Sequence, residues 1–405
     1  MGNGFAGKNI VVGVCGSIAA FKVAGWVSTL AKEEARVSVV MTDSAQKFIT
    51  PLTFAALTGE SVYTSMFAGD NSRAMSHIEL AQDASAFLIA PASAQTIARL
   101  AHGLADDLIS TAVLATRAPV ILCPAMNTRM YQHRATQDNL NRLRQLGYTI
   151  VDPESGLMAC KDEGPGRLVE WESVQEVLLR SLNKLDLQGE KVLVTAGPTR
   201  EPIDPARFIS NRSSGKMGYA LARAANRRGA EVVLVSGPSH LNCPYGVRRT
   251  MVGTAQEMYE AVTAEFEKAT ILIKSAAVSD FRPAVQYRHK VKKENGPQTL
   301  ELERNPDILY EIGRSKRKPG QVVVGFAAES EHLEEEARRK LEQKNLDMIA
   351  VNDISGPDTG FETDTNRIIL LTSDATFELP LLSKVATADR ILDILVENFR
   401  SSSSF

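Results

Sequence analysis

A lone cysteine stands in a charged, glycine-rich stretch of the chain. Cys160 lies within GLMACKDEGPGRL, residues 156–168, and no second cysteine is close enough in sequence to form a metal clamp or a redox pair. A free cysteine usually behaves as a small buried hydrophobe. Charged and glycine-rich neighbours are instead typical of a loop that covers a site. Because a thiol at such a site can deliver a proton, Cys160 is a candidate general acid.

Small and polar residues follow several apolar runs in the first half. GVCGSIAAFK places Gly16 and Ser17 between a strand-like and a helix-like run, where free N–H groups and the helix dipole suit a phosphate. The spacing is not G-x-G-x-x-G, so a tight turn and a phosphate site both stay open. Similar ends occur in TDSAQKF, APASAQT and CPAMNTRM, with the candidates Ser44, Phe48, Ser93, Ala94, Thr96, Ala125, Met126 and Asn127. Their convergence on one sheet edge favours a ligand with a ring and a phosphate.

The longest polar stretch of the second half is residues 195–222, TAGPTREPIDPARFISNRSSGKMGYALA. Gly215 and Lys216 suggest a P-loop, but Ser210 and Met217 stand where that motif needs glycine and Ser or Thr. We expect a long polar loop without structure of its own, which binds a ligand or pairs subunits. A solvent-exposed loop is the alternative.

Acidic and basic residues follow the next apolar runs. Asp280, in KSAAVSDFRP, is placed to hold a divalent cation, and YRHKVKK adds Lys290, Lys292 and Lys293. A solvated basic turn is the alternative for the three lysines. With Asp280 just upstream, a nucleoside triphosphate with Mg²⁺ is favoured. Later candidates are Asp307, Phe326 and two lysines one helical turn apart, Lys340 and Lys344.

The elements that must position these residues alternate between strand-like and helix-like runs. We expect strands at residues 8–15, 36–42, 85–91, 118–124 and 148–153, and then at 191–197, 230–238, 270–278, 321–329, 346–353 and 367–373. Helical spacing covers residues 19–33, 93–104, 130–147, 169–182, 218–228, 254–267, 330–344 and 384–398. The pattern predicts an α/β protein with two Rossmann-like three-layer domains, whose sheets are parallel and covered on both faces. A polar segment near 185–190 places the boundary, giving domains 1–188 and 189–405.

Composition restricts the classes of partner. The formal net charge of −2 provides no field that would gather nucleic acid, and no apolar run approaches a membrane span. The four cysteines lie far apart and no N-terminal signal segment is apparent. We therefore expect a cytoplasmic protein without disulfides, nucleic-acid partner or membrane anchor.

The first half resembles a known enzyme family. GSIAAFK, HIEL, APASAQT, PAMN and GLMAC with EGPGRL occur in the order seen in the phosphopantothenoylcysteine decarboxylases of coenzyme A biosynthesis. The resemblance implies a flavodoxin-like domain that binds FMN and forms trimers, with the active site at a subunit interface. It assigns His77 as the active-site histidine, Asn127 as the residue that orients the substrate carboxylate, and Cys160 as the flap cysteine. Gln95 and Lys161 depart from the asparagine and glycine common in the family.

The implied chemistry explains these residue types. An unactivated carboxylate has no electron sink, so its direct loss as CO₂ would leave an unstabilised carbanion. Oxidation of the neighbouring thiol by a flavin supplies that sink. CO₂ leaves to give an ene-thiolate, and Cys160 would protonate it as the flavin returns a hydride.

The second half resembles the phosphopantothenate-cysteine ligases, and the two halves together resemble the bifunctional bacterial family that carries both activities. The resemblance makes residues 195–218 a dimerisation motif, and places Asn211 and Arg207 at the activated acyl group. Asp280 matches a residue at the nucleotide and its Mg²⁺, and Lys290 matches the catalytic lysine. The implied cytidine nucleotide pocket is formed by Asp307, Phe326, Lys340 and Lys344. The substrates would be 4′-phosphopantothenate, cysteine and CTP.

Two other function classes remain open from the residues. A nicotinamide-dependent oxidoreductase would use the turn at Gly13 with Asp43 on the ribose. A catalytically silent flavin-binding regulator would lack the acid and base, and the presence of His77, Asn127 and Cys160 disfavours it. Family interfaces in both halves would give a homo-oligomer of trimers joined through dimers, closing as a dodecamer.

Overall fold

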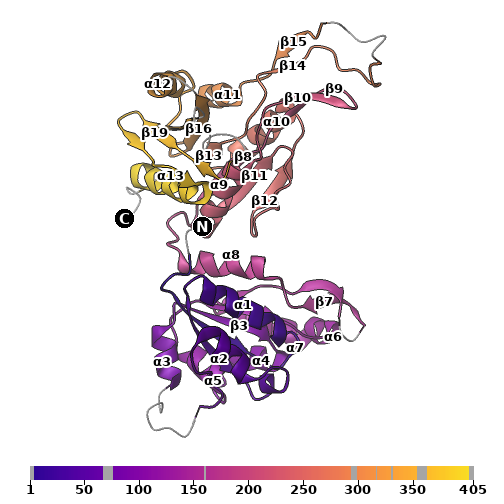
Figure 1. Ribbon diagram of the computed structural model, residues 1–405, viewed down its shortest axis with the longest axis vertical. Helices are drawn as coiled ribbons and strands as arrows, with labels where there is room; N and C mark the ends of the chain where they lie inside the picture. Colours follow the sequence, from indigo (N-terminus) through magenta and orange to yellow (C-terminus); the bar gives the residue numbers. More distant parts are fainter. Residues whose placement is uncertain are drawn as a thin grey trace. The chain divides into compact units, whose positions relative to one another are not determined.

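The computed structural model describes residues 4–66, 76–158, 161–292, 299–315, 317–329, 332–353 and 363–400. The chain divides between Asn183 and Lys184 into two compact units, which are described separately (Figure 1). No helix of the described residues is long and apolar enough to cross a membrane. Cys15, Cys123 and Cys243 are free thiols.

The first unit contains a five-stranded parallel sheet of order β2-β1-β3-β4-β5. Its strands are β1 (Asn9–Val14), β2 (Arg36–Met41), β3 (Ala86–Ala92), β4 (Val120–Pro124) and β5 (Thr149–Ile150). Its helices are α1 (Ala20–Lys32), α2 (Pro51–Thr58), α3 (Ser76–Asp83), α4 (Ala94–His102), α5 (Leu108–Ala115), α6 (Thr128–Gln132), α7 (Arg134–Gln145) and α8 (Trp171–Leu182). A short ribbon pairs β6 (Glu154–Leu157) with β7 (Glu163–Arg167).

Helices cover both faces of this sheet because successive strand residues point to opposite sides. Ile10 and Val12 of β1 pack with α1, α2 and α8, whereas Val11 packs with α3, α4, α5 and α7. The expected three-layer architecture is therefore confirmed for this unit. The expected helix 130–147 is interrupted at His133, which ends α6 and caps α7.

The second unit is built around an eight-stranded sheet of order β12-β11-β8-β13-β16-β17-β19-β20. These strands are β8 (Lys191–Ala196), β11 (Glu231–Ser236), β12 (Arg248–Met251), β13 (Ile271–Lys274), β16 (Val322–Glu329), β17 (Met348–Asp353), β19 (Ile368–Thr372) and β20 (Thr376–Glu378). One face is covered by α9 (Lys216–Arg227) and α13 (Lys384–Phe399). The other is covered by α10 (Ala255–Phe266), α11 (Ile308–Arg314) and α12 (Leu333–Gln343).

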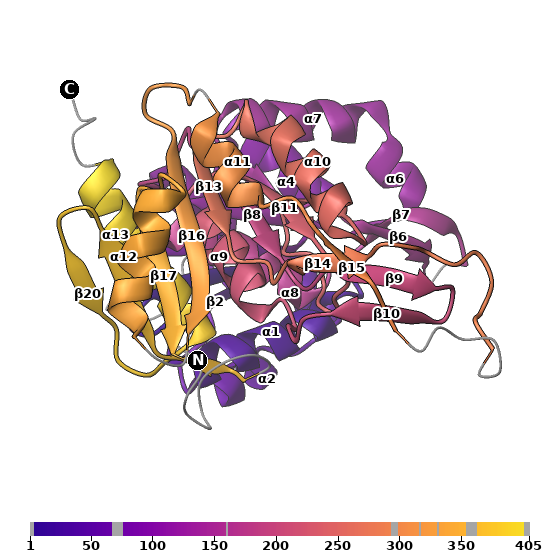
Figure 2. The ribbon, with the colours of Figure 1, turned by 90° about the horizontal axis from the view of Figure 1, so that it is seen from above.

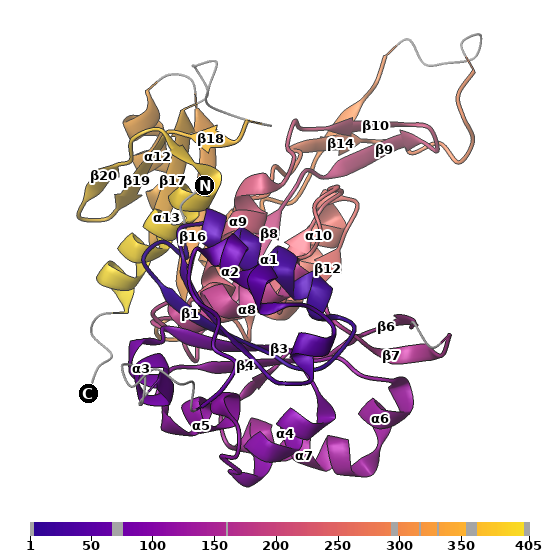
Figure 3. The same ribbon diagram turned by 60° about the horizontal axis from the view of Figure 1, so that its bottom comes forward.

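Two features of this unit differ from the sequence-based expectation. β19 pairs antiparallel with both β17 and β20, and the connection from β19 to β20 is only three residues long, too short for a parallel crossover. The stretch expected as a structureless loop contains a hairpin of β9 (Arg200–Asp204) and β10 (Arg207–Ser210). The hairpin could not be predicted from the sequence, because its two prolines and many polar residues hide the alternating pattern of a strand. It lies beside the ribbon of β14 (Phe281–Pro283) and β15 (Leu302–Arg304), as Figure 2 and Figure 3 show.

A nearly buried arginine holds the start of the second unit against its last helix. Arg228 is 8% exposed, and its guanidinium donates to both carboxylate oxygens of Asp186, at 2.6 and 2.8 Å. It also donates to Asp393 of α13, at 2.8 Å. The arginine thus connects residues far apart in the sequence, and its loss would leave two carboxylates without their cation.

We expect Arg228→Ala to lower the free energy of unfolding of the second unit by about 2 kcal/mol. The loss is smaller than for a fully buried pair because both carboxylates are partly exposed. Chemical denaturation followed by circular dichroism measures it. Arg338→Ala, which removes an exposed pair with Glu334, is the control and should change stability by less than about 0.5 kcal/mol. Equal effects of the two variants would contradict this role.

Two candidate active sites

The first unit has a cavity of about 540 Å³ at the carboxyl ends of β1, β2 and β3. Of the residues expected to bind a cofactor, it brings together Gly16, Ser44, Ser93, Ala94 and Thr96. Ser17, Phe48, Ala125 and Met126 do not line it. Gln95, Thr42, Asp43 and Arg99 also contribute to its wall. Arg99 was not identified from the sequence, because its position in α4 gives only a helical pattern.

Close packing shapes the wall of this cavity. A Cβ atom on Gly16 would lie 2.5 Å from the Cβ of Ser44, so only glycine allows these two strand ends to meet. Ser93 caps α4 and accepts a hydrogen bond from the Thr96 N–H at 3.3 Å. The Cys15 thiol donates to the Thr96 hydroxyl at 3.2 Å, and burial raises the pKa of Cys15. Helix α4 therefore presents an ordered N-terminus to the cavity, a geometry that suits a phosphate.

Asn127 lies at a different point, beyond β4. Its amide oxygen accepts from the Arg129 N–H at 2.8 Å, and its amide nitrogen donates to Asp162 at 2.7 Å. Asp162 immediately precedes β7, so this bond ties Asn127 to the ribbon of β6 and β7. The backbone N–H of Met126 also donates to Gly166 of β7, at 3.1 Å. The ribbon is thereby anchored beside the asparagine.

The turn of this ribbon carries the cysteine identified first in the sequence. Cys160 itself lies outside the described residues. The next residue, Lys161, has a φ of 66°, in the left-handed region that favours glycine. This conformation gives a physical reason for the glycine common at this position in the resembled family.

His77 is the second residue of α3, as the sequence predicted for a helical stretch. Its ring is partly buried, and its Nδ1 has no hydrogen-bond partner among the described residues. Figure 1 and Figure 3 show α3 and α6 on opposite sides of the unit, and His77 does not line the cavity. Within one subunit, His77 and Asn127 are therefore not brought together.

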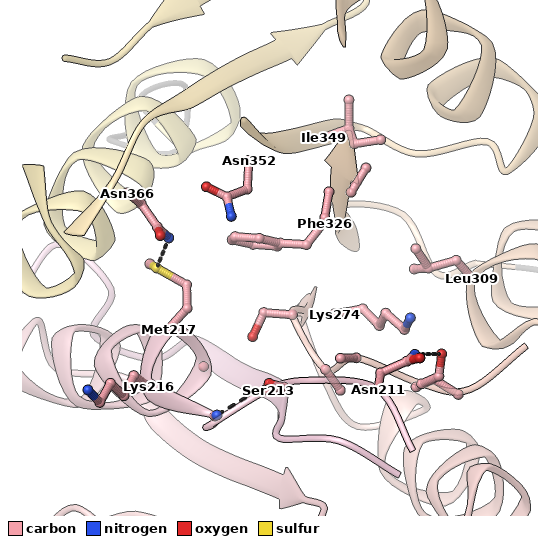
Figure 4. A pocket seen from close by; sticks show the side chains of 18 of the residues that line it. Asn211, Ser213, Lys216, Met217, Lys274, Leu309, Phe326, Ile349, Asn352 and Asn366 are labelled. Atoms are coloured by element: carbon pink, nitrogen blue, oxygen red, sulfur yellow. Dashed lines mark hydrogen bonds between the residues drawn. The ribbon is translucent and has the colours of Figure 1, made fainter. Parts of the chain in front are cut away.

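The second unit has a cavity of about 330 Å³, also at the carboxyl ends of parallel strands (Figure 4). The predicted residues that line it are Asn211, Asp280, Phe326, Lys340 and Lys344. The Asn211 amide donates to the carbonyl of Val278 at 3.0 Å. Asp307 does not line the cavity but pairs with Lys344, which does, at 2.7 Å. Lys340 pairs with Glu329.

A further lysine in this cavity was not identified from the sequence. Lys274, the last residue of β13, makes no ion pair within the part of the chain that the structure describes. Burial and the positive charge of Lys344 lower the pKa of Lys274 to about 8. Lys274 follows three apolar residues, so the sequence pattern identifies it only as part of a strand. The cavity is also lined by Lys384, Asn352 and Asn366, which were not identified from the sequence. Lys216 lines it too, although the sequence does not fit the P-loop that this lysine suggested.

Arg207 and Lys290 do not line this cavity. Arg207 donates to the buried carboxylate of Asp204 at 2.5 Å, and this bond holds the pKa of Asp204 well below its usual range. Asp204 also accepts from the N–H of Val291 at 3.2 Å, and Tyr287 donates to the carbonyl of Ile203 at 2.9 Å. The hairpin thus holds both ends of the segment that carries Lys290, whose side chain is exposed.

No group of three or more His, Cys, Asp or Glu side chains among the described residues could hold a metal ion by itself. Asp280 is the acidic residue that lines the second cavity, and its side chain is exposed to solvent. A single carboxylate suits Mg²⁺ only where phosphates of a bound nucleotide complete the coordination.

Comparison with known proteins relates both units to one family. Residues 4–183 match the family model described as Flavoprotein, and residues 187–399 match the DNA/pantothenate metabolism flavoprotein C-terminal domain. The chain is 44% identical over 390 residues to the Coenzyme A biosynthesis bifunctional protein CoaBC of Bacillus subtilis (strain 168), covering 95% of this chain and 96% of that protein.

The same protein of Escherichia coli (strain K12) is 45% identical over 399 residues, covering 97% of this chain and 98% of the relative. A crystal structure of the C-terminal domain of a Coenzyme A biosynthesis bifunctional protein CoaBC is 44% identical, with a TM-score of 0.45, and covers 52% of this chain and 96% of that chain. The resemblance noted from the sequence motifs is thus confirmed over nearly the full length. The chain belongs to the family of bifunctional coenzyme A biosynthesis proteins.

Proposed function

We propose that the protein catalyses two consecutive steps of coenzyme A biosynthesis. The second unit would activate 4′-phosphopantothenate with CTP and couple it to cysteine. The first unit would decarboxylate the product to 4′-phosphopantetheine with FMN. The observation that carries this proposal is the second cavity, where lysines gather around Asn211 and Asp280 in a chain of this family.

The residues of the first cavity fit FMN. The N-terminus of α4, capped by Ser93, and the close approach of Gly16 to Ser44 leave backbone N–H groups and hydroxyls for its phosphate. When bound, FMN would accept and return the electrons for transient oxidation of the substrate thiol. Four other residues are assigned to FMN by the resemblance alone: Ser17, Phe48, Ala125 and Met126.

The chain's own residues would bind and protonate the substrate of this step. Asn127, held by Asp162, would orient the substrate carboxylate, and the ribbon of β6 and β7 would bring the Cys160 thiol over it. His77 lies elsewhere in its own subunit, so we propose that it serves the site of a neighbouring subunit. This requires the trimer that the resemblance implies.

In the second cavity, the carboxylate oxygen of phosphopantothenate would bond to the α-phosphorus of CTP as pyrophosphate leaves. The amine of cysteine then bonds to the acyl carbon, CMP leaves with the former carboxylate oxygen, and the amine proton passes to solvent. Repulsion between the carboxylate and the triphosphate opposes the first step, so cations are needed where they meet. Lys274, Lys340 and Lys344 line the cavity to provide them. Asp280 would hold Mg²⁺, which would supply further positive charge to the reacting phosphate.

Lys290 and Arg207 would act where two subunits meet. Both lie in or beside the projecting ribbons, whose exposed apolar residues include Phe208 and Phe281, 49% and 46% exposed. Apolar patches of this kind are typical of protein interfaces. We propose that the ribbons of two subunits pair as a dimer, which together with trimers of the first unit would close a dodecamer.

We also propose that the protein is located in the cytoplasm.

Incubation of the purified protein with phosphopantothenate, cysteine, CTP and Mg²⁺ tests the proposed function. Mass spectrometry should detect 4′-phosphopantetheine, CO₂, CMP and pyrophosphate in equal amounts. The purified protein should be yellow. A colourless protein that releases no pyrophosphate from CTP would contradict the proposal.

We expect Cys160→Ser to release CO₂ but to stall before the reduced thiol product. Serine is a far weaker acid than cysteine, so the last protonation should be lost while the earlier steps continue. Single-turnover analysis should therefore show an oxidised ene-thiol product in place of 4′-phosphopantetheine. Turnover at the normal rate would remove Cys160 from its assigned role.

The lowered pKa of Lys274 predicts a pH dependence of CTP binding. Below pH 8 the lysine is charged and attracts the triphosphate, and above pH 8 it is neutral in the free protein. We expect the affinity for CTP to fall as pH rises from 7 to 9 and binding to take up a proton near the upper end. Calorimetry in buffers of different ionisation enthalpy measures both effects. Lys274→Met should bind CTP about tenfold more weakly at pH 7 and lose this dependence.

The exposed Lys191 provides a matched control, because it lies at the opposite end of the same sheet. Lys191→Met should keep the affinity and its pH dependence. An unaltered pH profile in Lys274→Met would show that another group titrates.

A further inference from the structure

One end of the second cavity contains a buried lysine and two unsatisfied amide oxygens. Lys384 is 8% exposed and has no ion pair among the described residues, and Asn366 is 4% exposed. The Oδ1 atoms of Asn366 and Asn352 are buried without a hydrogen-bond partner within the described ranges. All three residues line the cavity. Figure 4 shows Asn352 beside Phe326 and Asn366 next to Met217, whose sulfur accepts a hydrogen bond from the Asn366 amide nitrogen at 3.5 Å.

The fold brings these three side chains together from two strands and the start of a helix. Asn366 lies in β18 (Thr365–Asn366), which pairs with β21 (Leu382–Ser383) directly before Lys384. The backbone N–H of Lys384 donates to the carbonyl of Asp364 at 2.9 Å. Asn352 is the register partner of Ile368, two residues beyond Asn366. The group is therefore fixed by backbone pairing on each side.

The unsatisfied atoms define the chemistry of a ligand. Buried amide oxygens without donors are costly, so a ligand should bring N–H groups to them. Lys384 is the first residue of a 16-residue helix, so its ammonium group and the positive end of the helix dipole call for an anion. A ligand with an amine directly beside an anionic group satisfies both requirements.

The available charge distinguishes a carboxylate from a phosphate. The nearby Lys216 is already paired with Asp364 at 2.6 Å, which leaves Lys384 as the unpaired cation at this end of the cavity among the described residues. A carboxylate carries one negative charge and matches one lysine. A phosphate monoester carries between one and two at neutral pH and would need a second cation.

We propose that Asn352, Asn366 and Lys384 form the subsite for the amino acid substrate, an α-amino acid bound through its amine and its carboxylate. The inference rests on the proposed function, in which cysteine attacks the activated acyl group near Asn211. The two amide oxygens would accept the N–H bonds of the amine and leave its lone pair to form the new bond. Lys384 would hold the carboxylate.

The surrounding cations also suit the chemistry. An amine attacks only in its neutral form, and like charges nearby disfavour the ammonium form. Lys274 lines the same cavity and keeps its place when Lys384 is replaced, so a bound ammonium group should lose its proton readily. Burial and the charge of Lys216 lower the pKa of Lys384, although the nearby Asp364 opposes this shift, and a bound carboxylate would stabilise the charged form further.

The test compares cysteine with cysteamine, which lacks the carboxylate, in the full-length protein. We expect Lys384→Met to reduce kcat/KM for cysteine by about 10- to 100-fold, mainly by raising KM. The kcat/KM for cysteamine should be unchanged, because cysteamine has no carboxylate for Lys384 to hold. Pyrophosphate release from CTP and phosphopantothenate without cysteine should keep its rate. Lys384→Arg should retain most of the preference for cysteine. Arg390→Met, which removes an exposed cation of the same helix, should behave like the unaltered protein.

Two results would overturn the subsite. One is a Lys384→Met protein that keeps the cysteine-to-cysteamine preference. The other is a rise in the KM for phosphopantothenate with the cysteine KM unchanged, which would assign Lys384 to the phosphate. Failure of the unaltered protein to release pyrophosphate would instead overturn the proposed function, and the subsite with it.

Discussion

The positive charge gathered in one cavity is the constraint on which the second unit depends. Lys216, Lys274, Lys340, Lys344 and Lys384 all line it, whereas Asp280 is the acidic residue in its wall. Three of these lysines are held by carboxylates, and Lys274 and Lys384 are without such partners among the described residues. Partly buried cations so close together repel one another until an anion binds. The cavity therefore suits polyanionic substrates, and its lysines can reduce the repulsion between a carboxylate and a triphosphate that react there.

The first unit places its chemistry differently. Its cavity is closed by small residues at three strand ends, whereas Asn127 and the ribbon of β6 and β7 form a separate polar site beyond β4. His77, on α3, has a buried nitrogen without a partner in the described residues. These parts do not complete one catalytic site within a single subunit, which agrees with the proposed assembly of several subunits.

Much of the fold was predictable because parallel strands leave strong patterns. Buried runs such as residues 86–92 are apolar throughout. Ser93, Asn211 and Asp280 could be found because each follows such a run along the sequence. The hairpin at residues 200–210 was missed because its prolines and charges resemble a loop. Lys274 was missed because a lysine at the end of an apolar run has no local signal, and its environment depends on α12 and on Lys344. The antiparallel pairing of β19 with β20 follows from their short connection, whereas the apolar run of β19 contains no signal for its antiparallel direction against β17.

We infer that the second unit first joins a carboxylate to the α-phosphorus of a nucleotide, and that an amine then displaces the nucleotide from the acyl group. The most direct measurement uses phosphopantothenate labelled with ¹⁸O in its carboxylate, together with CTP, Mg²⁺ and cysteine. We predict that one labelled oxygen per turnover appears in CMP and none in pyrophosphate. Label in inorganic phosphate, or CMP without label, would contradict it.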